Sequence, residues 1–257
     1  MTDPALPEAA DLAPADRMAP LLVEAERLGI PLTSAQRDAF EAYLDLILAR
    51  NEWAGITSIA DEAEIQRRHL GESLALLAAL RSAGLITGVP LRVADLGPGG
   101  GFPGLPMAIV EPGLQLTLIE THGRRCEFLR EVVAALGLPN VEVVQARAED
   151  AGRTAGLRAG FDLVVARALA AVRILVEYAL PLLRTDGVLA TPKGSRWQDE
   201  LAEAANALAE LGGVALPPVL VPLPPDAPEQ TVVLVRRVGA LSDRYPRRAG
   251  IPVKRPL

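Results

Sequence analysis

Two different spacings of apolar residues divide the chain into an N-terminal and a C-terminal part. In residues 20–84, apolar side chains recur three and four positions apart, which places them on one face of a helix; an example is the series Phe40, Tyr43, Leu44, Ile47 and Leu48. Thr33 followed by Gln36 predicts a capping box before that series, and Asp61 followed by Glu64 predicts a second helix start. Residues 20–84 are therefore expected to form a helical region.

From residue 85 onward, short apolar runs alternate with longer helical segments. The apolar runs are typical of strands buried on both faces of a sheet, and they lie at Leu91–Leu96, Leu114–Ile119, Val141–Gln145, Phe161–Ala166 and Gly187–Thr191. The predicted helices between and after them are Pro103–Val110, Gly123–Leu136, Ala170–Leu183 and Arg196–Leu211. Such alternation predicts an α/β fold around a parallel sheet.

The last part of the pattern lacks a helix. Val214–Val221 and Thr231–Val235 are separated only by a proline-rich loop, which predicts a closing antiparallel hairpin and about seven strands in all. We therefore expect a Rossmann-like domain at residues 85–238. It would follow a disordered leader at 1–19 and the helical region, and precede a C-terminal tail at 239–257.

Composition narrows the class of protein. Hydrophobic residues make up 50% of the 257 residues and charged residues 23%, which is typical of a globular chain. No charge-free apolar stretch reaches the roughly 18 residues of a membrane span, and the acidic N-terminus does not resemble a signal peptide. The single cysteine, Cys126, and only two histidines argue against a disulfide and against a metal site. We expect a cytoplasmic monomer without metal or membrane.

Charge is unevenly distributed. The chain carries a net charge of −6, yet residues 236–257 hold seven arginines and lysines against a single aspartate. Such a basic tail is typical of a contact with phosphate, although charge alone leaves open a tail that only aids solubility. The candidates for such a phosphate contact are Arg244, Arg247, Arg248, Lys254 and Arg255.

A glycine-rich loop follows the first predicted strand. Glycines at this place allow a ligand to approach the backbone closely. The dinucleotide pattern G-x-G-x-x-G fits at Gly99, Gly101 and Gly104 but leaves Asp95 without a role. The pattern D-x-G-x-G-x-G, at Asp95, Gly97, Gly99 and Gly101, resembles the first motif of class I S-adenosylmethionine-dependent methyltransferases. We favour a methyl donor, held by these four residues and Phe102.

Two further acids are predicted to hold the nucleoside. Glu120 ends the second strand, where an acid accepts hydrogen bonds from ribose hydroxyls. Ala148 and Glu149 follow the third strand, where adenine would lie. Taken alone, Glu120 is compatible with an ordinary surface glutamate, and Ala148 and Glu149 with a helix cap.

The chain resembles the RsmG (GidB) family of 16S ribosomal RNA guanine-N(7) methyltransferases. The resemblance covers most of residues 45–257 and rests on the order of several motifs: Arg68-His69-Leu70, the run from Asp95 to Pro106, Arg147-Ala148-Glu149, Arg167-Ala168, Lys193-Gly194 and Arg244-Tyr245-Pro246-Arg247-Arg248. It departs from the family pattern at Gly55, at Glu72 in place of aspartate, and at Pro98-Gly99-Gly100.

The resemblance implies a class I methyltransferase fold and transfer of a methyl group from S-adenosylmethionine to a guanosine of 16S rRNA in the 530-loop region. The partner would be the rRNA or the small ribosomal subunit. Guanine N7 presents a free lone pair and carries no proton, so no general base is needed and catalysis would come mainly from positioning.

With an RNA substrate implied, the five tail cations are the predicted RNA contact, and four further cations are candidates for holding the RNA. Arg167 follows the fourth strand and is the predicted catalytic residue, where it would orient the guanine or a phosphate and contact the cofactor. Lys193 follows the fifth strand, and Arg124 with Arg125 occupies a helix start, where cations are unfavourable unless an anion is near. Surface solvation remains an alternative for these three.

Three other functions stay open from the sequence. The first is a methyltransferase of the same fold that acts on a small molecule or a protein. The second is a nicotinamide-dependent oxidoreductase that uses the alternative glycine spacing, and the third is an RNA-binding module without catalysis.

Overall fold

The computed structural model describes residues 16–257. Its N-terminal part is helical, as predicted, and consists of α1 (Ala19–Arg27), α2 (Ser34–Ala54), α3 (Glu62–Ile65), the π-helical segment η1 (Gln66–Gly71) and α4 (Glu72–Ser82). Both predicted helix starts are confirmed. Thr33 and Gln36 form a complete capping box, and Asp61 accepts a hydrogen bond from the backbone N–H of Glu64.

The start of the helical region lies earlier than predicted. Met18 is fully buried, and Asp16 accepts a hydrogen bond from Arg37 of α2 at 2.9 Å. Packing therefore reaches into residues 16–19, which the sequence assigned to a disordered leader; the remainder of that leader lies outside the described residues.

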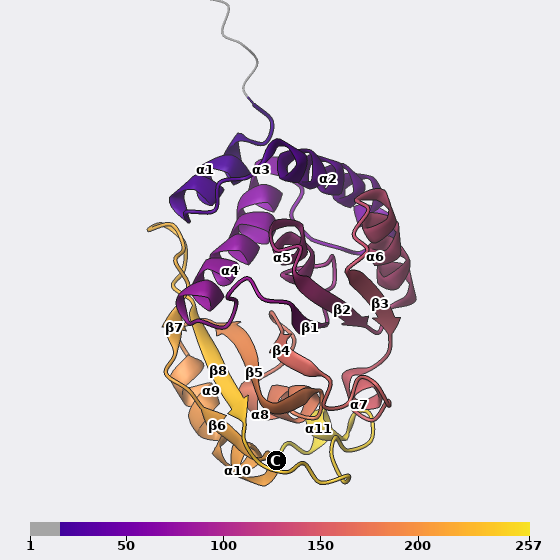
Figure 1. The fold of residues 1–257 in the computed structure, drawn as a ribbon, viewed down its shortest axis with the longest axis vertical. Helices are drawn as coiled ribbons and strands as arrows, with labels where there is room; N and C mark the ends of the chain where they lie inside the picture. Colours follow the sequence, from indigo (N-terminus) through magenta and orange to yellow (C-terminus); the bar gives the residue numbers. More distant parts are fainter. Residues whose placement is uncertain (1–15) are drawn as a thin grey trace, which may run out of the picture.

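Within residues 16–257, eight strands form one central sheet, in the order β3-β2-β1-β4-β5-β8-β6 with β7 beside β8 (Figure 1). The strands are β1 (Leu91–Leu96), β2 (Leu114–Glu120), β3 (Val141–Gln145), β4 (Phe161–Val165), β5 (Leu183–Lys193), β6 (Gly213–Ala215), β7 (Val219–Leu220) and β8 (Thr231–Arg237). The first five are parallel to one another, and β8 is antiparallel to β5, β6 and β7.

The predicted closing hairpin is confirmed, with one difference. The expected strand at 214–221 is divided into β6 and β7, which raises the number of strands from about seven to eight. Pro217 and Pro218 lie between the two halves. Because proline has no backbone N–H, it cannot donate to the ladder with β8.

Helices cover both faces of the sheet (Figure 1). Alternate residues of a strand point to opposite faces: on β4, Leu163 and Val165 belong to the core shared with α1, α2 and α4, whereas Val164 belongs to the core on the other face. The first face also carries α5 (Gly104–Val110) and α6 (Gly123–Ala135). The second carries α8 (Val172–Ala179), α9 (Trp197–Glu203) and α10 (Ala205–Leu211).

The helical region and the sheet share one continuous core. Phe40 and Leu44 of α2 and Leu74 of α4 are fully buried in the same cluster as Val93 of β1 and Phe128 of α6. The helical region is thus a covering layer of the sheet, and α2 and η1 reach the loops at the carboxyl ends of the strands.

The C-terminal tail packs back on the second face. Tyr245 is buried and its hydroxyl donates to Glu210, and a short helix, α11 (Ile251–Lys254), lies beside α8. Within residues 16–257, no helix combines the length and the apolar composition that crossing a membrane requires.

Candidate functional site

The glycine loop after β1 adopts a conformation that explains its composition. Gly97, Gly99 and Gly101 have φ angles of 66°, 59° and 101°. This left-handed region is strained for residues with a Cβ, whereas glycine occupies it freely. The D-x-G-x-G-x-G spacing therefore reflects three alternate left-handed positions in one turn between β1 and α5.

Two buried side chains form hydrogen bonds to the backbone of this loop and of the helix start that follows it. Asp95 is fully buried, and its Oδ2 accepts a hydrogen bond from the backbone N–H of Gly104 at 2.8 Å, which fixes the start of α5. Tyr43 of α2 is also fully buried, and its hydroxyl donates to the carbonyl of Gly100. The helical region thus supports the loop directly, a role that the sequence did not reveal.

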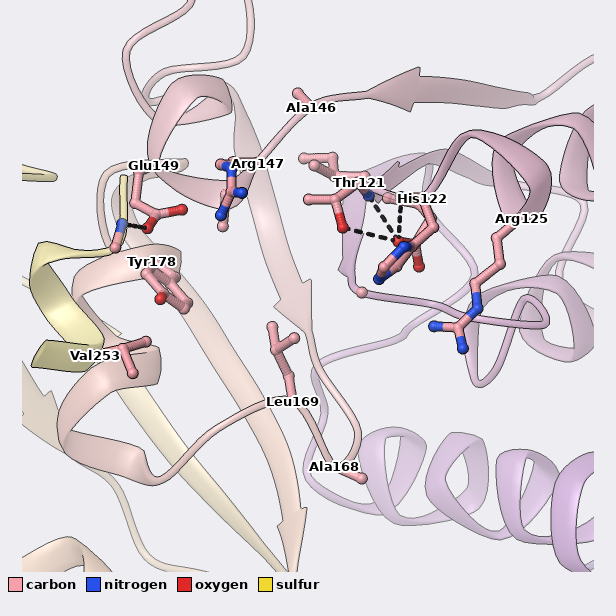
Figure 2. Close-up of a pocket in the computed structure, with 15 residues that line it drawn as sticks. Thr121, His122, Arg125, Ala146, Arg147, Glu149, Ala168, Leu169, Tyr178 and Val253 are labelled. Atoms are coloured by element: carbon pink, nitrogen blue, oxygen red, sulfur yellow. Dashed lines mark hydrogen bonds between the residues drawn. The ribbon is translucent and has the colours of Figure 1, made fainter. Parts of the chain in front are cut away.

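A cavity of about 320 Å³ lies at the carboxyl ends of β1, β2, β3 and β4. This volume falls in the range of small-molecule sites, and the position is where open α/β sheets bind ligands. In Figure 2, Thr121, His122 and Arg125 lie on one side of the cavity, Glu149, Tyr178 and Val253 on the other, and Leu169 between them. We call it the cofactor cavity.

Glu120 lines this cavity and is only 3% exposed. Its Oε1 accepts hydrogen bonds from the backbone N–H groups of Thr121 and His122 at 2.6 and 2.9 Å. Within the described part of the chain, its Oε2 accepts only one, from Gly99 at 3.2 Å. A carboxylate oxygen has two acceptor positions, so Oε2 retains capacity for a ligand hydroxyl.

Glu149 lies across the cavity and links it to the tail. Its Oε1 accepts a hydrogen bond from the backbone N–H of Gly250 at 2.8 Å, and Val253 of α11 also lines the cavity. Ala148, at the start of α7 (Ala148–Ala151), is a further lining residue. The tail is therefore a wall of the cofactor cavity, whereas the sequence predicted only an RNA contact for it.

Not every predicted cofactor residue lines this cavity. Gly97, Glu120, Ala148 and Glu149 do, whereas Asp95, Gly99, Gly101, Phe102 and Arg167 are not among its lining residues. Asp95 Oδ1 is buried without a hydrogen-bond partner among residues 16–257. Burial raises the pKa of Asp95 to about 7, because removal from water disfavours the charged carboxylate.

Arg167 lies at the end of β4 in a network contributed by the helical region. Its guanidinium donates to the carbonyl of Arg68 at 3.1 Å and to Nδ1 of His69 at 3.2 Å. It lies 3.5 Å from a carboxylate oxygen of Glu72 and over the ring of Phe102, with 5.6 Å to the ring centroid. Two hydrogen bonds and the ring of Phe102 thus orient this predicted catalytic side chain, and Glu72 lies beside it.

His69 is held as a neutral ring in this network. Arginine only donates, so Nδ1 must accept from Arg167, and Nε2 then carries the proton and donates to Thr57 Oγ1 at 2.7 Å. The ring stacks on Phe102 with 4.6 Å between centroids. Burial and the neighbouring Arg167 and Arg68 lower the pKa of His69 to about 4. Sequence reasoning assigned this histidine no chemistry.

The arginines and the lysine that are predicted to contact RNA differ in exposure and in the partners that they already have. Arg125 lines the cofactor cavity and donates to the carbonyl of Gly55, while Arg124 is exposed. Lys193 is mostly buried; it donates to the carbonyl of Ala170 and pairs with Glu200 at 2.9 Å. The sequence suggested that Lys193 contacts RNA, yet its ammonium is already engaged within the protein.

Arg247 of the tail is also engaged internally. Its guanidinium forms a bidentate pair with Glu177 of α8, whose carboxylate is only 1% exposed. Arg244, Arg248, Lys254 and Arg255 are exposed. The structure therefore brings four of the five predicted tail cations to the surface, and it assigns Arg247 to packing, because a buried carboxylate requires a charged partner.

No group of three or more potential metal ligands occurs among the described residues 16–257. The polar side chains that line the cofactor cavity are two carboxylates, two arginines, a histidine, a threonine and a tyrosine. Such a set suits a polar organic ligand with hydroxyl and amino groups.

Comparison with solved structures identifies the fold. A mutant of MtNAS in complex with S-adenosylmethionine superimposes with a TM-score of 0.54 at 17% identity, over 82% of this chain and 78% of that one. TrmN from Thermus thermophilus has a TM-score of 0.50 at 20% identity, over 67% and 53% of the two chains. The fold is that of class I methyltransferases, as the glycine motif predicted.

Comparison of sequences identifies the family. A family model described as GidB, rRNA small subunit methyltransferase G, matches residues 36–217. Proteins named ribosomal RNA small subunit methyltransferase G are 41% identical in Chloroflexus aggregans, over 89% of this chain and 93% of the relative, and 37% identical in Lactobacillus helveticus, over 92% and 97%. The chain belongs to the GidB family of small-subunit rRNA methyltransferases.

Proposed function

We propose that this protein transfers the methyl group of S-adenosylmethionine to N7 of a guanosine in the 530-loop region of small-subunit rRNA. The observation that carries the proposal is the cofactor cavity, where Glu120 and Glu149 face a ligand site beside the glycine loop in a chain of the GidB family. The relatives' name specifies rRNA of the small subunit; the ring nitrogen and the loop come from the family resemblance.

The polar groups of the cavity fit the methyl donor. Oε2 of Glu120 has room for the ribose hydroxyls, and Ala148 and Glu149 are suited to the adenine edge. Asp95 is fully buried and does not line the cavity; it supports the site by accepting from the backbone N–H of Gly104 at the start of α5. When bound, the cofactor supplies an electrophilic methyl group on a sulfonium.

The residues around Arg167 suit a reaction that moves no proton. Guanine N7 is an acceptor with a free lone pair, so it attacks the methyl carbon without a base. His69, the titratable ring nearest to Arg167, is neutral and bonded at both nitrogens, which suits support rather than proton transfer. Arg167 holds the guanine or a neighbouring phosphate, and its fixed geometry supports catalysis by positioning.

The rRNA contacts cations beside the cofactor cavity and on the tail. Arg124 and Arg125 lie at the start of α6 beside the cofactor cavity, and the tail presents Arg244, Arg248, Lys254 and Arg255. Arg247 pairs with the buried Glu177 instead. Lys193 keeps its predicted role in RNA binding, because it lines a cavity together with Arg167. We expect the protein to act as a monomer on the small ribosomal subunit or its RNA in the cytoplasm.

The experiment is methyl transfer from labelled S-adenosylmethionine to small ribosomal subunits, taken from cells that lack this protein, followed by mass analysis of the nucleosides. We expect about one label per subunit, recovered as 7-methylguanosine, and no label with subunits that already carry the methyl group. Label in a different nucleoside, or in protein, would contradict the proposal.

A further inference from the structure

A second cavity, of about 500 Å³, adjoins the first at one residue. Ala168 lines both cavities and follows directly on Arg167 at the end of β4. The second cavity lies between η1 and α4 on one side and the segments after β5 and before β8 on the other; the lining residues used below are His69, Glu72, Arg167, Ala168 and Gln230. Ala168 is thus the residue that the two cavities share.

Glu72 supplies a carboxylate with free acceptor capacity in this cavity. Its Oε1 accepts from Arg68 Nε at 3.0 Å. Among residues 16–257, its Oε2 has only two long contacts, at 3.5 Å to Arg167 and at 3.4 Å to Gln230. Both exceed the usual length of hydrogen bonds to nitrogen. The side chain is 15% exposed, so Oε2 is mostly shielded from water and still open to a stronger donor.

Among the RNA bases, guanine has the hydrogen-bonding groups that match Glu72, an acceptor, and Arg167, a donor. A carboxylate only accepts hydrogen bonds and an arginine only donates them. The Watson–Crick edge of guanine presents two adjacent donors, N1–H and the N2 amino group, followed by the acceptor O6. Adenine presents an acceptor, N1, beside its amino group, so the carboxylate would meet a lone pair. Proteins that read single-stranded bases commonly do so on this edge.

We propose that the second cavity receives the target base, and that Glu72 selects guanine by accepting from N1–H and the N2 amino group. This inference rests on the proposed function, since it names the residue that recognises the methylated base. N7 lies on the opposite side of the purine from N2. A guanine held by Glu72 therefore turns N7 away from this carboxylate and leaves its lone pair free for the methyl group, while Arg167 faces O6.

The test compares nucleotide binding to the full chain saturated with S-adenosylhomocysteine. The probes are GMP, IMP, which lacks the N2 amino group, and AMP, with dissociation constants measured by NMR titration. A hydrogen bond to a charged group changes affinity roughly ten- to hundredfold. We expect the wild-type protein to bind GMP at least about tenfold more tightly than AMP, with IMP between them.

Two variants separate recognition from folding. Glu72→Gln should reduce the preference for GMP over AMP to within about threefold, because an amide offers one acceptor and adds a donor. Glu64→Gln is the matched control: Glu64 also pairs with an arginine of η1, Arg67, but does not line this cavity. Its nucleotide preference should equal that of the wild type.

The outcomes distinguish this inference from the proposed function. Equal binding of GMP and AMP by the wild type, absence of GMP binding, or an unchanged preference in Glu72→Gln overturns the role of Glu72, even if small subunits are methylated. Conversely, a clear preference that Glu72→Gln removes supports the inference, even if the methylated nucleoside differs from the expected one. If circular dichroism shows that Glu72→Gln is unfolded, the wild-type comparison of GMP with AMP and the variant Glu72→Asp test the inference instead. Glu72→Asp should retain the preference for GMP.

Discussion

The guanidinium of Arg167 donates a hydrogen bond to Nδ1 of His69 over 3.2 Å, and this bond joins the end of β4 to η1 of the helical region. The other ring nitrogen of His69 is bonded to Thr57. The helical region thus holds the side chain of Arg167, which lines the second cavity next to Ala168, the residue that both cavities share.

Replacement of Arg167 should impair turnover and spare cofactor binding. In Arg167→Ala the methylation rate constant should fall by about a hundredfold, the cost of losing a well-positioned group, while the dissociation constant for S-adenosylmethionine stays within about threefold of the wild-type value. Arg167→Lys should be nearly as impaired, because one ammonium cannot reproduce the fork that meets His69 and the Arg68 carbonyl. Single-turnover kinetics and calorimetry measure the two quantities. Equal losses of rate and cofactor affinity would contradict the assignment.

His69 should act through Arg167. His69→Asn keeps an acceptor near the position of Nδ1 and should retain most of the activity, whereas His69→Ala should lose roughly tenfold, the value of one hydrogen bond to a charged group. The lowered pKa, about 4, means that the wild-type ring stays neutral and accepting until the pH approaches 4. NMR titration of the ring checks this value. Titration of His69 near its ordinary pKa would contradict the account of the network.

Glu120 should control cofactor affinity. Glu120→Gln removes the carboxylate and should weaken binding of S-adenosylmethionine roughly ten- to hundredfold, since hydrogen bonds to a charged group are worth about 1.5–3 kcal/mol. Glu142→Gln is the control, because Glu142 is an exposed carboxylate on the neighbouring strand β3. Calorimetric titration of both variants measures the effect. Unchanged affinity in Glu120→Gln would show that the ribose lies elsewhere.

Asp95 should make stability depend on pH. Its pKa is about 7 in the folded protein and 3.8 as the ordinary value, so the folded state binds the proton more tightly. The stability from Asp95 is complete below about pH 4 and is lost as pH rises through 7. The free energy of unfolding of Asp95→Asn, relative to wild type, should therefore rise by a few kcal/mol between pH 4.5 and 8. Urea unfolding at several pH values measures it, and a difference independent of pH would contradict the raised pKa.

Replacement of two adjacent arginines of the tail should affect two different properties: Arg247 should control stability, and Arg248 should control RNA binding. Arg247→Ala leaves the buried carboxylate of Glu177 unpaired and should destabilise the fold by about 3–5 kcal/mol. Arg248→Ala removes an exposed charge and should change stability by less than about 0.5 kcal/mol. If the tail contacts single-stranded RNA, Arg248→Ala should lower the slope of log affinity against log salt by about 0.7. Urea unfolding and RNA binding at several salt concentrations separate the two effects; identical behaviour of both variants would contradict them.

Much of the fold was predictable because it follows from local patterns. The runs at Leu91–Leu96 and Val141–Gln145 match β1 and β3 at both ends, because short apolar runs rich in valine and leucine predict strands. This holds even though β3 lies at the edge of the sheet and is buried only at Val141. Helix caps at Thr33 and Asp61 are equally local. The division of the last hairpin into β6 and β7 was not predicted. It depends on how Pro217 and Pro218 lie opposite β8, and this follows from the pairing of the strands.

The sequence predicted the glycines and the acidic residues of the candidate site, but it did not predict the residues that hold them in place. Glu120 and Glu149 line the cavity because they follow parallel strands that end at one edge. Tyr43 and His69 come from helices far away in the sequence, so no spacing rule indicates that they contact Gly100 and Arg167. The engagement of Arg247 was missed because Glu177, its partner, lies 70 residues away on α8.

The most direct test of the account is a crystal structure of the protein with bound S-adenosylmethionine. We predict that the ribose hydroxyls contact Glu120, the adenine lies beside Ala148 and Glu149, and the sulfonium lies next to Ala168, where the two cavities meet. A cofactor bound at any other place, or no binding at saturating concentration, would contradict it.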